Sequence, residues 1–416
     1  MNNTISIKII TQEDVAAIFD SHADRLFEIV EDAFLKASKG EVLFPDKISQ
    51  IFDTQTQNRI NCMPATLLGN KVAGLKWVSV FPTNAPKGIQ NVTGVMLLSE
   101  IETGFPIAVI DGTLCTQLRT AAVGCVAAKY LAPKKVETVG FIGAGEEARM
   151  HFTLLKHLFP SIRTCKVASR HSATEDRFIA EFDKIIPDVH FIACRGDNSQ
   201  AVADTDIIVT AISGQAPVLK ARDVRAGMLY IHVGGWEDEY GVALKADKIV
   251  CDDWNASKHR TQTICRMYKE GLLKDKDIYA DLAEIIAGQK KGRESDEEFI
   301  YFNSVGLSYI DLNFAHEIYR EASLLGLGRD IVLAESDRVD YRCFILYLPA
   351  YFYPEQAASA YLSDNRNQAF ADAGFDMVVY TPVPTRGISI EERKKYKHRK
   401  ADSMYGGRMI VYRFSL

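Results

Sequence analysis

The chain has 416 residues, of which 47% are hydrophobic, 25% charged and 10% aromatic. This composition is typical of a soluble globular protein with two or three domains, and it excludes a disordered chain. The formal net charge is -5, without the excess of basic residues that nucleic-acid-binding proteins carry, so we expect no nucleic-acid partner.

The eight cysteines lie far apart, without the short paired spacings of a zinc site or a redox motif. We therefore expect reduced, mostly buried thiols and no metal site. The opening segment "MNNTISIKIITQEDV" is polar, unlike a signal peptide, and no apolar run approaches the ~20 residues that span a bilayer. These features predict a cytoplasmic protein with no membrane partner.

The first third of the chain predicts strands within residues 58–69, 71–84 and 91–112, with turns at Gly69-Asn70 and Thr103-Gly104. A sheet of this kind is able to hold side chains over a cofactor that a neighbouring domain binds.

Three cations in this region are candidate substrate ligands. Lys76 stands inside an apolar strand, where a lysine is rarely buried without a partner. Arg119 is expected to begin the helix "RTAAVGCVAAKYL", and a guanidinium fork at a positive helix end suits a carboxylate. Lys47 follows Pro45, and its alternative is an ordinary surface lysine.

A glycine-rich turn follows these strands. Val136 to Ile142 is a short apolar run, and it leads into Gly143-x-Gly145-x-x-Ala148 and then into a helical pattern that Pro160 ends. Gly143 permits a tight turn, Gly145 lets the backbone approach a pyrophosphate, and Ala148 allows close packing of helix on strand. The alternative is a purely structural turn.

Further strands and helices alternate after this turn, with strands at 165–169 and 189–193 and in "TDIIVTAIS", "MLYIHVGG" and "DKIVCDD". We predict an α/β protein with a doubly wound, Rossmann-type nucleotide-binding domain. At the end of its second strand the chain offers Ser169 and Arg170 instead of an acidic residue. This pair favours the 2′-phosphate of NADP(H), although NAD(H) stays possible.

The segments "GLKWVSVFPTN", "TGFPIAVIDGTLCTQLRTAA", "VGFIGAGEEARMHF" and "FIYFNSVGLSYIDLNFAHEIYREA" resemble the ornithine cyclodeaminase/mu-crystallin family of NAD(P)-dependent proteins. The resemblance covers residues 5–330 and favours the branch that holds an amino-acid dehydrogenase of siderophore synthesis. It implies a homodimer with an α+β substrate and dimerisation domain (1–133 and 302–335) around the Rossmann domain (134–301).

The resemblance also implies roles for individual residues. Arg119 and Lys76 bind the α-carboxylate of a small amino-acid substrate, and Lys47 stands where the family often has an arginine with the same role. The predicted cofactor-binding residues are Thr116, Thr120, Gly143, Ala144, Gly145, Glu146, Ala148, Ser169, Arg170, Thr210, Ala211, Val233 and Gly234.

One departure from the family concerns the acid–base group. Cyclodeaminases carry an aspartate directly after a Gly-Gly pair, whereas here Trp236 follows Gly235. We expect Glu237 or Asp238, with Lys76, to serve as catalytic groups, unless these acids are simply solvated.

Three functions follow from the resemblance. The first is an NAD(P)-dependent oxidoreductase that acts on a C–N bond of a small α-amino or imino acid through an imine. The second is an ornithine cyclodeaminase, which converts L-ornithine to L-proline and ammonia. The third is a non-catalytic binding protein of mu-crystallin type that holds NADPH and a small ligand.

Residues 336–416 lie beyond this family. "CFILYLPAYFYPE", "QAASAYLSDNRNQAFADAGF" and "DMVVYTPVPTRG" predict a short extension of strand, helix and strand. This βαβ pattern resembles the first unit of a truncated GT-B glycosyltransferase, so the extension is expected to take no part in the reaction.

Overall fold

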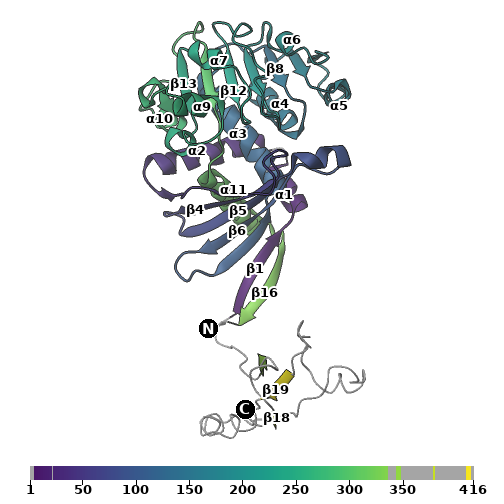
Figure 1. Ribbon diagram of the computed structural model, residues 1–416, viewed down its shortest axis with the longest axis vertical. Coiled ribbons are helices and arrows are strands. Elements are labelled where there is room, and N and C mark those ends of the chain that lie inside the picture. The colour runs from purple at the N-terminus through teal and green to yellow at the C-terminus, as the bar shows by residue number, and fades with distance from the viewer. Residues whose placement is uncertain (1–3, 21, 336–342, 348–377, 380–408, 414–416) are drawn as a thin grey trace. The chain divides into compact units, whose positions relative to one another are not determined.

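The computed structural model describes residues 4–20, 22–335, 343–347, 378–379 and 409–413 (Figure 1). Residues Ile5–Leu333 form one compact unit, which includes all but the outermost residues of the two expected domains. The boundary expected after residue 133 stays a prediction. Within the described residues, no helix is long and apolar enough to cross a membrane.

A mixed, mostly antiparallel sheet forms the substrate half of this unit. Its order is β16-β1-β7-β6-β5-β4-β2, and β3 also pairs with β4. The strands are β1 (Thr4–Ile10), β2 (Val42–Leu43), β3 (Ile48–Ile51), β4 (Arg59–Leu67), β5 (Val72–Val80), β6 (Val92–Glu100), β7 (Pro106–Asp111) and β16 (Arg329–Glu335).

Helices cover one face of this sheet because alternate residues of β4, β5 and β6 are apolar or otherwise buried there. The helix α11 packs directly on these three strands. The helices of this half are α1 (Gln12–Phe19), α2 (Ala23–Ser38), α3 (Thr113–Leu131) and α11 (Ser308–Leu325), with a 3-10 turn η1 (Pro82–Lys87).

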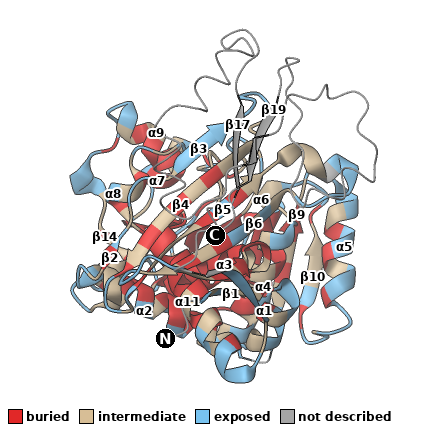
Figure 2. Cartoon of the chain, turned by 90° about the horizontal axis from the view of Figure 1, so that it is seen from below, coloured by how far each residue is buried: buried red, intermediate tan, exposed pale blue. Residues whose placement is uncertain are grey.

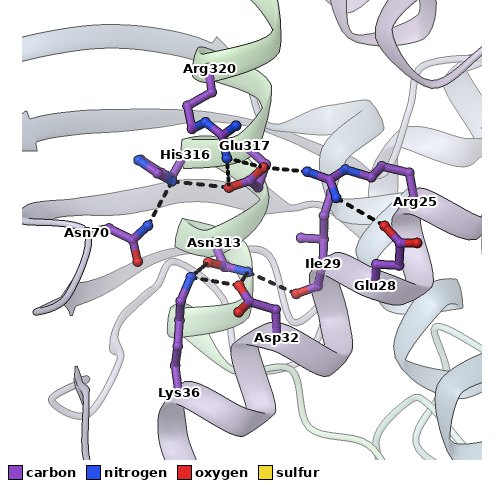
Figure 3. Close-up of polar contacts among 10 residues, drawn as sticks. All are labelled: Arg25, Glu28, Ile29, Asp32, Lys36, Asn70, Asn313, His316, Glu317 and Arg320. Carbon is purple, nitrogen blue, oxygen red and sulfur yellow. Dashed lines mark hydrogen bonds and ion pairs between the residues drawn. The ribbon is translucent and has the colours of Figure 1, made fainter.

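Polar contacts join α11 to α2 (Figure 3). Asn313 donates from Nδ2 to the Ile29 carbonyl oxygen at 2.9 Å and to Asp32 at 3.1 Å. One turn further along, Glu317 accepts from Arg25 at 2.8 Å. These contacts fix the position of α11, which carries the acidic residue of the candidate site.

The second half contains the predicted doubly wound sheet. All of its pairings are parallel, in the order β10-β9-β8-β11-β12-β15-β13-β14. The strands are β8 (Thr138–Ile142), β9 (Thr164–Ala168), β10 (His190–Ala193), β11 (Ile207–Thr210), β12 (Leu229–His232), β13 (Lys248–Cys251), β14 (Ala280–Asp281) and β15 (Ile300–Asn303).

Short helices and loops surround this parallel sheet, as expected for the Rossmann arrangement. They are α4 (Glu146–Leu158), α5 (Ser172–Phe182), α6 (Asn198–Val202), α7 (Tyr240–Leu244), α8 (Trp254–Ser257), α9 (Thr263–Lys269), η2 (Asp275–Asp277) and α10 (Leu282–Ile286).

The helix α3 lies at the junction of the two halves. It contacts α4 and β12 on one side and α2, α11 and β6 on the other (Figure 1). The prediction that Arg119 begins this helix is wrong, because the helix already starts at Thr113. The carboxylate of Asp111 accepts hydrogen bonds from the backbone N–H groups of Thr113 and Leu114 at 3.1 and 2.8 Å. It therefore caps the helix by giving partners to two N–H groups of the first turn.

On the opposite face of the mixed sheet, several apolar side chains are exposed to solvent. The edge strand β3 is exposed along its whole length (Figure 2). Ile48, Cys62, Trp77 and Val95 pair in register across β3, β4, β5 and β6. Ile48 is 64%, Trp77 39% and Val95 46% exposed. The sheet therefore presents an apolar row, which we call the open face, on the side away from α11.

The three strands described after residue 335 are β17 (Cys343–Tyr347), β18 (Val378–Val379) and β19 (Met409–Arg413). β17 and β18 fall within the two strands expected there, but each pairs with β19 in antiparallel fashion. The helix expected between them lies outside the described residues. The predicted βαβ pairing therefore stays untested in its central element.

Candidate active site

Lys76 projects from β5 towards α11, on the buried face of the mixed sheet. In the sheet register it lies between Met63 and Met96, and it is only 1% exposed. Its ammonium donates to Asp311 Oδ1 at 2.7 Å. Burial and the neighbouring Arg119 lower the pKa of Lys76 to about 8, although Asp311 acts in the opposite direction.

Arg119 reaches the same carboxylate from α3, with Nε 2.8 Å from Asp311 Oδ1. Its guanidinium lies against Gly306, in the loop between β15 and α11. A Cβ at this position would come within 2.7 Å of the guanidinium, and the φ of +82° favours glycine in any case. The two predicted carboxylate ligands, Lys76 and Arg119, are therefore brought together as expected.

Asp311 was not among the predicted site residues. It lies in the first turn of α11 and is 1% exposed, and within the described residues its Oδ2 has no hydrogen-bond partner. A lone acid in the otherwise apolar "SYIDLNF" is the signal that could have found it, because a buried carboxylate needs a cation. Two cations and one anion leave the group with a net positive charge.

Glu147, in the first turn of α4, is a second residue that the prediction missed. Its Oε2 is sealed from solvent and has no hydrogen-bond partner among the described residues. Burial raises the pKa of Glu147 to about 7, and the positive charges of Arg119 and Lys76 oppose this shift. Arg119 and Lys76 are thus close enough to Glu147 to influence its pKa.

Lys47 lines a cavity of about 370 Å³ beside this group. The walls come from the segment before β3, from the loops around α8 and from the start of α11. Burial and the cations Arg260 and Arg59 lower the pKa of Lys47 to about 7. Lys47 is half-buried in the wall of this cavity, and its role as a substrate ligand stays a prediction.

The glycine turn has the geometry expected for a pyrophosphate cradle. Gly143 has a φ of +108°, and a Cβ there would collide with the carbonyl oxygen of Ala211 at 2.4 Å. A Cβ on Gly145, at the start of α4, would meet nothing within 4 Å, so space is left for a ligand at the helix N-terminus. Ala148, in the first turn of α4, is fully buried. These residues fit a dinucleotide, and Ala144 and Glu146 lie in the same turn.

Ser169 and Arg170 follow β9, as predicted, and Arg170 is exposed. The nearest acid, Glu175, is fully buried and accepts from the backbone N–H groups of Ser169, Arg195 and Gly196 at 2.7 to 2.9 Å. Its carboxylate thus joins the loop after β9 to the loop after β10 through backbone hydrogen bonds.

The remaining predicted cofactor residues lie on α3 and at the ends of β11 and β12. Thr116 and Thr120 are buried on α3, and their hydroxyls donate to the carbonyls of Gly112 and Thr116. Thr210 ends β11 and Ala211 follows it, while Val233 and Gly234 follow β12. All of these strand ends lie at the carboxyl edge of the parallel sheet, where dinucleotides bind.

Glu237 and Asp238 are not brought to this cavity. Both are fully buried beneath the turn after β12. Glu237 accepts from Thr210 Oγ1 at 2.7 Å and from the Gly234 N–H at 2.8 Å. Asp238 accepts from Thr263 at 2.6 Å, and burial raises its pKa to about 6. The alternative of solvated loop acids is therefore wrong, and neither residue lines the cavity.

The sequence profile of the ornithine cyclodeaminase/mu-crystallin family matches residues 8–324. The chain belongs to this family. It is 34% identical over 327 residues to an alanine dehydrogenase of Archaeoglobus fulgidus, an alignment that covers 78% of this chain and 97% of that protein.

Two solved structures of the family extend the comparison. One is the Delta(1)-pyrroline-2-carboxylate reductase of Thermococcus litoralis in complex with NADH and L-proline, with a TM-score of 0.73 and 29% identity over 78% of this chain and 100% of that one. The other is an archaeal alanine dehydrogenase dimer with bound NAD, with a TM-score of 0.71 and 32% identity over 79% and 100%. The expected family, fold class and class of enzyme are confirmed.

Proposed function

We propose that the protein is an NAD(P)-dependent oxidoreductase that acts on the C–N bond of a small α-amino or imino acid. The observation that carries this proposal is the buried Lys76–Asp311–Arg119 group beside a glycine cradle that fits a dinucleotide. The activities of the relatives in the family support the same class of reaction.

The two cations have a direct role in substrate binding. Asp311 neutralises one of the two positive charges of Lys76 and Arg119, so one is left for the α-carboxylate of the substrate. The guanidinium fork is suited to a bidentate contact, and its position is fixed by the absence of a side chain at Gly306. The buried Lys76–Asp311–Arg119 group therefore binds the carboxylate with its remaining positive charge and so orients the α-carbon of the substrate.

Proton transfer needs a group that changes charge near neutral pH, and Glu147 meets this requirement. A nicotinamide cofactor held by the glycine turn would supply or accept the hydride. Glu147 takes up the proton that leaves the amino nitrogen during oxidation and returns it during imine reduction, and Lys76 holds the substrate carboxylate. This assignment replaces Glu237 and Asp238 as the proton-transfer groups, because both are sealed beneath the β12 turn.

We further propose that NADP(H) is preferred over NAD(H). Arg170 is exposed at the end of β9 and offers a guanidinium to a 2′-phosphate. Glu175 already accepts three backbone hydrogen bonds from the loops after β9 and β10, so it is not available for ribose hydroxyls.

A homodimer is proposed from the open face. An exposed apolar row across four strands is typical of a surface that another copy of the chain covers. The related archaeal alanine dehydrogenase was solved as a dimer, which supports this assignment.

We assign the reaction to residues 5–330, with the substrate domain in 1–133 and 302–335 and the Rossmann domain in 134–301. The extension from residue 336 resembles the start of a GT-B glycosyltransferase and takes no part in the reaction. A cytoplasmic location is proposed because the seven cysteines up to Cys265 are unpaired, and six of them are buried.

The test is a screen of the purified protein against small amino acids and cyclic imino acids, with NADPH and NADH absorbance as the readout. We expect turnover with at least one pair of substrate and cofactor. Release of proline from ornithine would instead indicate a cyclodeaminase. Tight NADPH binding without turnover of any compound would indicate a binding protein of mu-crystallin type.

A further inference from the structure

The parallel sheet contains the point at which its strand order reverses. The order β10-β9-β8-β11-β12-β15 corresponds to the Rossmann order 3-2-1-4-5-6, so the reversal lies between β8 and β11. In sheets of this topology a dinucleotide binds in the crevice at the carboxyl ends of these two strands. The first of them leads into the glycine turn, and the second leads into residues 211–218, which we call the β11 loop.

The β11 loop packs directly against the glycine turn. A Cβ on Gly143 would collide with the carbonyl oxygen of Ala211, so the two backbones are in contact. The Ala211 N–H also donates to the carbonyl oxygen of Ile142 at 3.0 Å. A shift of the β11 loop would therefore change the shape of the cradle that Gly143 forms.

Glu237 holds the β11 loop near both of its ends. Its Oε1 accepts from the Ile212 N–H at 2.6 Å, and its backbone carbonyl oxygen accepts from the N–H groups of Val218 and Leu219 at 2.7 and 3.0 Å. The other side-chain oxygen, Oε2, accepts from the Gly234 N–H at 2.8 Å. One carboxylate thus joins the loop after β11 to the turn after β12.

This position requires an acceptor at both side-chain oxygens. Besides the two N–H groups of Ile212 and Gly234, the hydroxyl of Thr210 donates to Oε2 at 2.7 Å. A carboxylate accepts at both oxygens, whereas an amide accepts at only one. Because Glu237 is fully buried, water would not replace a lost partner. A glutamine here would therefore release either the β11 loop or the turn after β12.

We propose that Glu237 is a positioning residue for the cofactor, because it holds the β11 loop against the glycine turn in the arrangement that binds the dinucleotide. This inference rests on the proposed NAD(P) site and deepens it. The effect of Glu237 is indirect, since its side chain is sealed beneath the turn after β12. A direct electrostatic effect would have the opposite sign, because removal of a negative charge strengthens the binding of an anion.

The experiment compares the binding of the whole cofactor with that of its adenosine half, by calorimetry. The cofactor is whichever of NADPH and NADH the wild type binds more tightly, and the half is adenosine 2′-monophosphate or adenosine, respectively. This half lacks the pyrophosphate and the nicotinamide, so it needs the loop after β9 but not the β11 loop. We expect Glu237→Gln to weaken cofactor binding about tenfold or more and to leave the affinity for the adenosine half unchanged.

Two other variants serve as matched controls. Glu175→Gln alters a buried carboxylate that joins the loops after β9 and β10, so it should weaken the binding of both ligands. Glu297→Gln changes an exposed acid and should alter neither affinity. The contrast between the two buried carboxylates separates a local effect on the β11 loop from a general effect of losing a buried charge.

Unchanged or tighter cofactor binding by Glu237→Gln would overturn the inference. An equal loss of the cofactor and of its adenosine half would also overturn it, since that pattern indicates general damage to the domain. If Glu237→Gln shows no cooperative melt, Thr210→Val provides the same comparison, because it removes one donor and keeps the carboxylate. A wild type that binds neither cofactor rejects the proposed function as well, whereas cofactor binding that Glu237→Gln leaves intact rejects this inference alone.

Discussion

Asp311 Oδ1 lies 2.7 Å from Lys76 Nζ, although the two residues are 235 positions apart in the chain. The pair is buried, and the same oxygen also contacts Arg119. The carboxylate therefore holds together the two cations that we propose bind the substrate carboxylate.

The first prediction concerns this acid. Asp311→Asn should lower the free energy of unfolding by about 3–5 kcal/mol, because two buried cations lose their shared counter-charge. Denaturant unfolding would measure the change, and Asp330→Asn, which removes an exposed partner of Lys8, is the control. A loss below about 1 kcal/mol, the range of surface pairs, would show that Asp311 does not neutralise the group.

The second prediction concerns substrate binding. Arg119→Met should reduce kcat/KM by the equivalent of about 2–5 kcal/mol, because the substrate carboxylate loses its partner in a buried place. The affinity for the cofactor should not change, since the cradle lies on α4. Arg222→Met is the matched control on the surface. Unchanged kcat and KM in Arg119→Met would remove this residue from the site.

The third prediction is a pH dependence caused by Glu147. Its pKa is raised to about 7, so its ionised form accumulates as the pH rises above about 7. Oxidation of the amino acid needs the ionised form as a proton acceptor, so its rate should rise with pH through this value. Imine reduction needs the protonated form, and its rate should fall over the same range.

The variant Glu147→Gln tests this assignment. We expect it to lose the step near pH 7 from both profiles and to lower kcat by about 10²-fold or more. Glu297→Gln, which changes an exposed acid away from the candidate site, should keep both the step and the rate. A step that persists in Glu147→Gln would assign the proton transfer to another group.

The fourth prediction concerns cofactor choice. NADPH should bind more tightly than NADH, and Arg170→Ala should remove most of the difference by weakening NADPH alone. Because the contact is an ion pair near solvent, the preference should also decrease as salt is added. Quenching of protein fluorescence by each cofactor would measure the affinities, and equal affinities in the wild type would reject the proposal.

The fifth prediction concerns assembly. Trp77→Glu should convert the proposed dimer to a monomer, because a charge would replace the largest side chain of the open face. Analytical ultracentrifugation would show the change in mass. Leu244→Glu, which alters an exposed leucine in the other half of the unit, should leave the mass unchanged. A monomeric wild type would contradict the proposal directly.

Local patterns were sufficient to predict the parallel sheet and its glycine turn, because each strand is a short apolar run that a helical pattern follows. The family resemblance, and not a local pattern, predicted that Lys76 and Arg119 share one site. The start of α3 was missed because Asp111 and Gly112 have the pattern of a strand end, and only the hydrogen bonds of Asp111 reveal the cap.

The partners in the site could not be predicted from local patterns. Asp311 and Gly306 are distant in sequence from Lys76 and Arg119, and their proximity to these cations depends on the chain returning from β15 into α11. Glu147 has the appearance of a solvated acid in a helix with Glu146 beside it. Its burial follows from the packing of α4 on α3, which no local pattern records.

The helix α3 carries Arg119 on one part of its surface and Gly124 on another, five residues further along. A Cβ at Gly124 would lie 2.7 Å from Nε2 of His151 on α4. The side chain of His151 therefore packs directly against the backbone of α3 at this point. At 1.5 Å per residue, the substrate cation and the contact with the dinucleotide helix are separated by about 7.5 Å along one rigid rod. Under the proposed function, the distance between the substrate carboxylate and the cofactor would therefore be set within one helix and not by the loops around it.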